Sequence, residues 1–410
     1  MSYLSLRYPI TLQNPLSYLE TKNLYPKIFW QNSSRIRIGL GKLLSSATLP
    51  IFDKNKDDCW FGSIPFMENF SEKEDPWKDF IFTDFFLPSI YLELNPHDYT
   101  GTISFHYLEN ERPPKDLIDS YLQDSGSYTP KWENTFLERK DNPSFEQWSC
   151  LINKALETFE KTALKKVVLA RATSLLFKES INPLSIVNHL KSHTLNSTLF
   201  AYIPSQSSAF IGSSPETFYT RTDRNLKTAA VAGTRKRGLN KEEDKSLCLE
   251  LLQGAKEKEE FQHVVDFFEK ALSNLCKHYE KTLDITLRQT TTVQHLYHQF
   301  QGYLYPFVTD STLIENLHPT PAVGGLPRNL ALTFLKDNEP FHRGLYAAPL
   351  GWISQSQTEL IVAIRSSLVN HNQLILFAGV GVVKGSEPIK EWEELEDKIS
   401  QFIKGPSYAR

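Results

Sequence analysis

Carboxylates interrupt the apolar faces of stretches whose periodicity predicts helices. Between Lys241 and Cys276, Glu260 shares a helical face with Val264 and Phe268. A carboxylate among apolar side chains is unfavourable unless a cation, a metal ion or hydrogen bonds meet it. An ion pair with Lys256, one turn earlier, would meet that need, and so would a metal ion. The spacing alone leaves both interpretations open.

A second group of charges lies near the end of the chain. Glu391, Glu394 and Lys398 fall at i, i+3 and i+7, which places them on one side of a helix that begins near Glu387. Such a group is an ordinary charged helix edge or a site for a hard cation such as Mg²⁺, which prefers carboxylate oxygens. No cluster of histidines and cysteines in the sequence favours zinc instead.

Composition excludes several other classes of protein. The chain has 410 residues, 40% of them hydrophobic, and a formal net charge of −3, so it offers no general basic surface for nucleic acid. The basic run Thr234–Arg237 is interpreted as a solvated turn. No signal peptide is visible, and the longest apolar run is shorter than the roughly 20 residues that span a bilayer. We expect a soluble cytoplasmic protein without disulfides, because its cysteines are scattered: Cys59, Cys150, Cys248 and Cys276.

The second half of the sequence predicts its elements most clearly. Ser144 and Gln147 form a capping box that opens a helix, and Lys165–Arg171 follows as a buried strand. Further on, the sequence predicts one long helix over 241–276, strands near 285–292 and over 359–368 and 374–384, and a closing helix. Strands and helices do not alternate strictly, which favours an α+β fold over a doubly wound sheet. The first 130 residues suggest aromatic-rich strands and show no legible chemistry.

A series of motifs from Ser144 to Ile403 resembles the chorismate-utilising family, which includes isochorismate synthases, salicylate synthases and anthranilate synthase component I. The motifs occur in the family's order: Lys166-Val-Val-Leu-Ala-Arg171, Gly212-Ser-Ser-Pro-Glu216, Ala232-Gly-Thr-Arg235, Lys256-Glu-Lys-Glu-Glu260, Gln294-His-Leu296, Leu317-His-Pro-Thr-Pro-Ala322, Arg343-Gly-Leu-Tyr346, Ala363-Ile-Arg365, Ala378-Gly-Val-Gly381, and Glu391-Trp-Glu-Glu394 with Lys398.

The resemblance implies a fold of two facing antiparallel-rich β-sheets with helices outside and an active-site cleft between the halves. This is the fold of anthranilate synthase component I. We therefore expect a single enzyme domain over 1–410. Residues 1–143 would contribute strands, and residues 144–404 would carry the catalytic motifs.

The resemblance also implies catalytic and metal-binding roles. Lys166 matches the family's general base, so it must be neutral when it acts, and Glu216 matches the general acid, which must keep its proton near neutral pH. Glu260 and Glu394 match ligands of a magnesium cofactor, with Glu391 as a further or water-mediated partner.

Other matching positions imply contacts with the substrate, chorismate. Arg365 and Lys398 would bind its carboxylates, and Tyr346 with the backbone amide of Gly379 would hold the enolpyruvyl group. Further residues are expected in the cleft with less definite roles: Gly233, Thr234 and His295.

Differences within the family favour isochorismate synthase, an isomerase, over the aminating members. Anthranilate-type relatives carry glutamine in place of Lys166, and aminodeoxychorismate-type relatives carry a lysine in place of Ala232. Water is therefore the expected nucleophile, and no glutaminase partner is expected. Phe261 and Ala348 depart from the family's usual histidine and glycine, which bears on the shape of the pocket.

Salicylate synthase, which goes on to eliminate pyruvate, and a non-catalytic chorismate-binding protein stay open as alternatives. The sequence also leaves open a monomer or a homodimer, and a downstream route to menaquinone, siderophore or salicylate.

Overall fold

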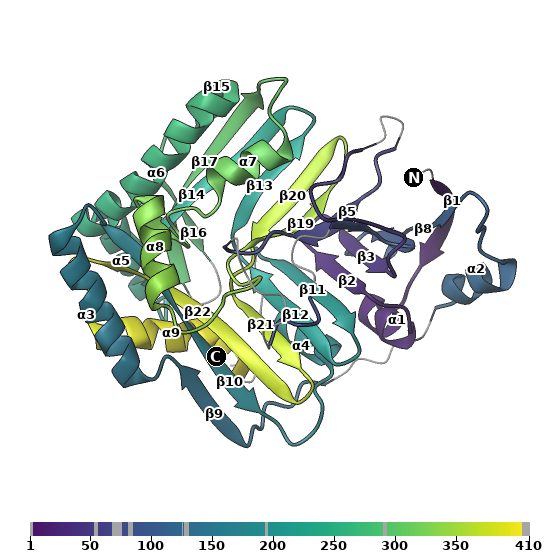
Figure 1. The fold of residues 1–410 in the computed structure, drawn as a ribbon, viewed down its shortest axis with the longest axis horizontal. Helices are drawn as coiled ribbons and strands as arrows, with labels where there is room; N and C mark the ends of the chain where they lie inside the picture. The colour runs from purple at the N-terminus through teal and green to yellow at the C-terminus, as the bar shows by residue number, and fades with distance from the viewer. Residues whose placement is uncertain are drawn as a thin grey trace.

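The computed structural model describes residues 3–52, 56–67, 76–80, 85–124, 126, 131–192, 196–289 and 293–403. It consists of a 12-stranded and a 10-stranded antiparallel sheet with helices on their outer faces (Figure 1). The predicted α+β class is confirmed. Strands from residues 1–143 lie in both sheets, beside strands from later parts of the chain.

The first sheet carries strands from both ends of the sequence. In spatial order its strands are β1 (Tyr3–Thr11), β8 (Thr100–Leu108), β7 (Ile90–Leu94), β3 (Ile36–Leu40), β2 (Lys27–Gln31), β11 (Thr198–Ser205), β12 (Ser208–Ser214), β21 (Ser366–Asn370), β22 (Gln373–Val383), β10 (Lys166–Leu176) and β18 (Gly325–Leu326), with β9 (Glu138–Asn142) also pairing with β10. Lys166 pairs with Val383 on one side and Leu326 on the other, so it lies inside the sheet and not at an edge.

The second sheet faces the first across the core. In spatial order its strands are β15 (Cys276–Lys281), β17 (Val293–Leu304), β14 (Asn225–Lys236), β13 (Thr217–Thr222), β20 (Gln357–Val362), β19 (Pro349–Ile353), β5 (Trp60–Ser63), β6 (Phe85–Leu87) and β4 (Leu44–Ser46), with β16 (Thr286–Gln289) also pairing with β17. Of the strand predicted over 285–292, residues 290–292 lie outside the described residues.

The helices cover the outer faces of the sheets. They are α1 (Pro15–Thr21), α2 (Lys115–Leu122), α3 (Phe145–Lys161), α4 (Pro183–Lys191), α5 (Lys241–Gln253), α6 (Ala255–Leu275), α7 (Asp310–Leu317), α8 (Arg328–Asn338) and α9 (Pro388–Ile403). Helices α3, α4 and α9 pack on the first sheet or on each other, whereas α5 and α6 pack on the second (Figure 1).

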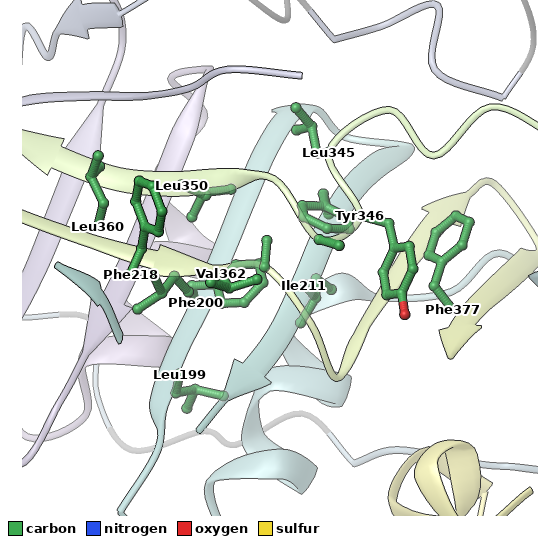
Figure 2. Close-up of a cluster of buried hydrophobic side chains, with 14 of the residues drawn as sticks. Leu199, Phe200, Ile211, Phe218, Leu345, Tyr346, Leu350, Leu360, Val362 and Phe377 are labelled. Atoms are coloured by element: carbon green, nitrogen blue, oxygen red, sulfur yellow. The ribbon is translucent and has the colours of Figure 1, made fainter. Parts of the chain in front are cut away.

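Apolar side chains fill the space between the two sheets. Leu199, Phe200 and Ile211 come from the first sheet and meet Phe218, Leu350, Leu360 and Val362 from the second (Figure 2). Buried apolar area of this kind contributes about 25 cal/mol per Å² to folding. Toward one end of this core, Tyr346 stacks on Phe377 with ring centroids 5.2 Å apart (Figure 2). The core therefore reaches the place where the predicted site residues gather.

The chain crosses between the sheets at two neighbouring points. After β12 it passes through Pro215 and Glu216 into β13 of the second sheet, and after β20 it returns through 363–365 into β21 of the first. The amide of Ser213 donates to the carbonyl of Arg365 (3.1 Å), which joins the two crossings. The prediction of one strand over 359–368 is wrong because the chain changes sheets within it.

The prediction of one long helix over 241–276 is also wrong. The chain forms α5 and α6, separated at Gly254, which has φ −59° and ψ 119° and therefore leaves the helical region. Glycine is a frequent helix terminator because it opposes non-helical backbone least. Because α5 ends before Gly254, α6 begins as a separate helix, and it places Glu260 over the second sheet.

Local predictions at the start of the motif-bearing part are confirmed. Ser144 and Gln147 form both hydrogen bonds of a capping box at the start of α3. In the following strand, Lys165 is exposed and Lys166 is 7% exposed, as expected for neighbours that point to opposite faces. Strand β10 therefore places the side chain of Lys166, and not that of Lys165, in the interior.

Candidate active site

One cavity brings the predicted site residues together. It has a volume of about 260 Å³ and is lined by elements of both sheets and by α6 and α9. All predicted site residues with a described side chain line it: Lys166, Glu216, Gly233, Glu260, His295, Tyr346, Arg365, Gly379, Glu391, Glu394 and Lys398. The side chain of Thr234 lies outside the described part of the chain.

An ion pair spans the cavity between the two halves of the fold. The ammonium of Lys166, on β10, lies 2.6 Å from Oε1 of Glu260, on α6. The side chain of Lys166 is 9% exposed and that of Glu260 is 24% exposed, so the pair is screened from water. The Glu260 carboxylate is therefore paired with the Lys166 ammonium. This pairing offsets the cost of a carboxylate on an apolar helix face. The alternative partner, Lys256, has a side chain outside the described residues.

Glu216 lies at the first crossing and is held there by its backbone. Its amide donates to Oγ of Ser214 (3.2 Å), and its carbonyl accepts from the amide of Val362 (3.0 Å). Burial raises the pKa of the Glu216 carboxyl to about 7, against the opposing influence of Arg288, Lys166 and Lys398. The carboxyl can therefore hold a proton near neutral pH and release it, as an acid catalyst must.

Arg365 lies at the second crossing, in a strained conformation. Its φ of 52° is in the left-handed region, which is unfavourable for a residue other than glycine. One guanidinium nitrogen donates to the carbonyl of Lys398 (3.1 Å). Burial lowers the pKa of Arg365, with Glu394 opposing that shift, so the charge is only partly compensated. A planar guanidinium of this kind suits a bidentate contact with a carboxylate.

Helix α9 brings its acidic and basic side chains to the same cavity. Lys398 lies 2.6 Å from Glu394 and donates to the carbonyl of Gly379 (2.8 Å), which ties the helix to β22. Burial would raise the pKa of Glu394, but Lys398 and Arg365 lower it below its usual value, so this carboxylate is ionised. Glu391 lines the cavity one turn earlier.

The carboxylates fit a hard cation by their chemistry, but they are not a preformed metal cluster. Within the described residues, no three side chains of His, Cys, Asp or Glu are placed to hold a metal ion. Glu260 and Glu394 each face an ammonium group at 2.6 Å instead. Their oxygens are ligands that Mg²⁺ accepts, and Glu391 supplies a further carboxylate in the same wall.

Tyr346 and Gly379 are in close contact. A Cβ added at Gly379 would come within 2.8 Å of the phenol oxygen of Tyr346, so only glycine leaves this part of the cavity open. Burial raises the pKa of Tyr346, which keeps the phenol protonated as a hydrogen-bond donor.

Gly233 and His295 lie opposite these residues in the second sheet. Gly233 has φ 66° at an irregularity in β14, a conformation that favours glycine. Burial, together with Arg365 and Lys398, lowers the pKa of His295 to about 4, and the ring hydrogen-bonds the Gly233 backbone. The His295 ring is therefore neutral at physiological pH, and it contributes a polar but uncharged side chain to the cavity lining.

The basic run Thr234–Arg237 is not the solvated turn that the sequence suggested. Residues up to Lys236 continue strand β14 because they pair with β17. Each of the three cations of the run lies within ion-pair distance of a carboxylate: Arg235 of Glu257, Lys236 of Asp397 and Arg237 of Asp244. Arg235 lies 2.6 Å from Glu257, and both line the cavity.

Sequence reasoning missed other residues of the cavity. Arg343 was noticed only as part of a motif, yet its buried guanidinium pairs with Glu339 (2.7 Å) and donates to the carbonyls of Val168 and Val323. Arg288 gave no signal because an arginine in a polar strand ordinarily faces solvent. The departures at Phe261 and Ala348 are both buried in the core, outside the cavity lining.

Comparisons with known proteins agree with this arrangement. The sequence profile of the family described as "Chorismate binding enzyme" matches residues 46–405. Isochorismate synthase MenF of Bacillus subtilis is 32% identical over 367 residues, which is 88% of this chain and 76% of that protein.

Solved structures show the same fold. The structure of MenF, the menaquinone-specific isochorismate synthase of Escherichia coli, superposes with a TM-score of 0.87 at 26% identity, over 98% of this chain and 95% of that one. Anthranilate synthase component I of Streptococcus pneumoniae superposes with a TM-score of 0.71 at 18% identity, over 97% and 92% of the two chains.

The chain belongs to the chorismate-binding enzyme family, and the predicted family and fold are confirmed. The cysteines are free, as expected. Among the described helices, none is both long enough and apolar enough to cross a membrane.

Proposed function

We propose that the protein is an isochorismate synthase that converts chorismate to isochorismate with water as the nucleophile. One observation carries the proposal. A carboxyl with a pKa of about 7 shares a single cavity with a lysine and with an arginine suited to a substrate carboxylate. The similarity to MenF of Bacillus subtilis supports the same activity.

The residues account for each proton and bond in the reaction. Lys166 accepts a proton from water as the water oxygen bonds to C2 of chorismate, and the ring double bonds shift. The bond from C4 to its hydroxyl breaks, and Glu216 donates its proton to the departing oxygen, which leaves as water. The proposal requires that the ion pair between Lys166 and Glu260 opens before Lys166 accepts this proton.

Two residues of the cavity support water, and not ammonia, as the nucleophile. The positions at which aminating relatives differ, Lys166 and Ala232, both line it. Ala232 offers no nucleophile, and Lys166 offers a base next to the space for substrate. We therefore propose that the protein works without a glutaminase partner.

We also propose that Mg²⁺ is the cofactor and that Glu260, Glu394 and Glu391 hold it. When bound, the ion would supply positive charge to these carboxylates and to the ring carboxylate of the substrate. Lys398 and Arg365 then contact substrate carboxylates, while Tyr346 and the amide of Gly379 hold the enolpyruvyl group.

The first test is turnover of chorismate by the purified protein with magnesium, with and without EDTA, with the products separated by chromatography. We expect isochorismate alone, formed only with magnesium and without ammonia. Salicylate with pyruvate would show a salicylate synthase instead. Binding of chorismate without turnover would show a non-catalytic member of the family.

A matched pair of variants on α9 tests the metal assignment. Glu394→Gln is expected to raise the magnesium concentration for half-maximal activity at least tenfold, because a charged ligand is lost. Glu393→Gln, on an exposed neighbour in the same helix, is expected to behave as wild type. Equal magnesium dependence in the two variants would exclude Glu394 as a ligand.

Gly381→Ala is expected to reduce turnover on the order of 10²-fold with little change in stability. A Cβ at this position would lie 2.8 Å from Cε and 3.2 Å from Nζ of Lys166, so the amine must move. A misplacement of about 1 Å can cost that much activity. Steady-state kinetics and thermal unfolding measure the two effects, and full activity would contradict the assigned position of Lys166.

A further inference from the structure

The charges that line the cavity are mostly paired. Each of these cations has a carboxylate within ion-pair distance: Lys166 with Glu260, Arg235 with Glu257, Lys398 with Glu394, and Arg343 with Glu339. Within the described residues, the two remaining cations of the lining, Arg288 and Arg365, have no such partner. An unpaired arginine in a partly buried wall favours an anionic ligand.

Arg288 reaches the cavity from the edge of the second sheet. It lies on β16, directly opposite His295 of β17 in the strand register. Its guanidinium donates to the carbonyl of Asn196 (3.2 Å), just before β11 of the first sheet, and lies 5.6 Å from the centre of the Tyr297 ring. A guanidinium carries five N–H donors, so most of its donors stay available for a ligand.

Arg288 and Glu216 line the same cavity. The charge of Arg288, like those of Lys166 and Lys398, lowers the pKa of the Glu216 carboxyl against the effect of burial. Glu216 is the residue that would protonate the hydroxyl leaving from C4. An anion held by Arg288 therefore lies in the cavity that also contains Glu216.

We propose that Arg288 is a substrate-binding residue that pairs with a carboxylate of the dianionic substrate in this cavity. The inference rests on the proposed function, because chorismate carries two carboxylates and keeps both in isochorismate. Arg365 and Arg288 together give the cavity two arginines that have no carboxylate within ion-pair distance among the described residues. Arg288 contributes binding and orientation, whereas Lys166 and Glu216 transfer the protons.

The test compares Arg288→Gln with Arg288→Lys and with Arg224→Gln. Glutamine removes the charge and keeps a donor for Asn196, and lysine restores the charge. Arg224 is the matched control because it also donates to a backbone carbonyl, that of Leu304, and lies over the Tyr303 ring, but it does not line the cavity.

In Arg288→Gln we expect the KM for chorismate to rise at least tenfold, with kcat within about threefold of wild type. Each tenfold change corresponds to about 1.4 kcal/mol. Arg288→Lys should recover most of the loss, and Arg224→Gln should keep the wild-type KM. The charge of Arg288 lowers the pKa of Glu216, so its removal should raise that pKa. The alkaline limb of the pH profile of kcat/KM should therefore move to higher pH in Arg288→Gln.

Calorimetric titration with chorismate separates this inference from the proposed function. If wild type turns over chorismate and Arg288→Gln keeps its KM and affinity, the assignment of Arg288 is wrong and the proposed function stands. If wild type binds chorismate without turnover, the proposed activity is wrong, and a tenfold loss of affinity in Arg288→Gln would still support the contact. The assignment of Arg288 would be wrong if wild type and Arg288→Gln bound chorismate with equal affinity, or if wild type did not bind chorismate.

Discussion

Glu216→Gln is expected to lower kcat/KM for chorismate by about 10²–10⁴-fold, the usual contribution of a general acid. The amide is close in shape to the protonated carboxyl, so it keeps the packing, but its N–H protons are not acidic enough to be transferred to the departing hydroxyl. Steady-state kinetics on the purified variant measures the effect. A variant with more than a tenth of wild-type activity would remove Glu216 from the proton transfer.

The pH dependence of wild type provides an independent check. Glu216 must be protonated to act, and its pKa is about 7. Activity should therefore be high below pH 7 and fall as the pH rises through that value, as long as the base stays competent. An alkaline limb far from pH 7 would point to a different acid.

Thermal unfolding shows whether Glu216→Gln loses activity because the acid is missing or because the protein is destabilised. Burial raises the pKa of Glu216 from 4.5 to about 7, so wild type loses stability as the pH rises across that interval. The loss is at most about 3–4 kcal/mol, taking about 1.4 kcal/mol per pKa unit. Glu216→Gln carries no such charge, so at pH 8 it should unfold at the same temperature as wild type or higher.

Lys166→Met is expected to abolish measurable water addition, with a loss of about 10²–10⁴-fold or more. Methionine has a similar length and no basic nitrogen, and it leaves Glu260 without the ammonium that lies 2.6 Å away. Turnover of chorismate, followed by chromatography, measures the effect.

The sequence offers a matched control for this substitution. Lys165 precedes Lys166 and faces solvent, so Lys165→Met should keep wild-type kinetics. Thermal unfolding of both variants shows whether the loss at Lys166 is chemical. Comparable activity in the two variants would mean that the base lies elsewhere.

Local rules were sufficient for the features that depend on neighbours in the sequence. The capping box at Ser144 and the opposite exposure of Lys165 and Lys166 follow from short-range geometry alone. The shared helical face of Glu391, Glu394 and Lys398 also places these residues in one cavity wall, as a spacing of three and four residues predicts. The gathering of acid, base and carboxylates in one place was predicted only through the family resemblance.

Features that depend on distant contacts were not predicted. The strand at 359–368 has no break signal in its composition, and it divides because the chain leaves one sheet for the other at 363–365. Arg288 looks like any polar strand residue until β16 pairs with β17 and sets it opposite His295. Arg288 is singled out because it has no carboxylate partner within the described residues. Ion pairs between residues distant in the sequence cannot be predicted from one sequence.

The paired crossings have a mechanical consequence. Glu216 and Arg365 lie on two segments joined by a hydrogen bond, so we expect them to move together when the two sheets shift. Lys166 and Glu260 lie on opposite halves and are joined by their ion pair, so we expect their separation to change when that pair opens. The proposed acid and the proposed substrate contact would then keep their spacing while the proposed base changes its distance from both.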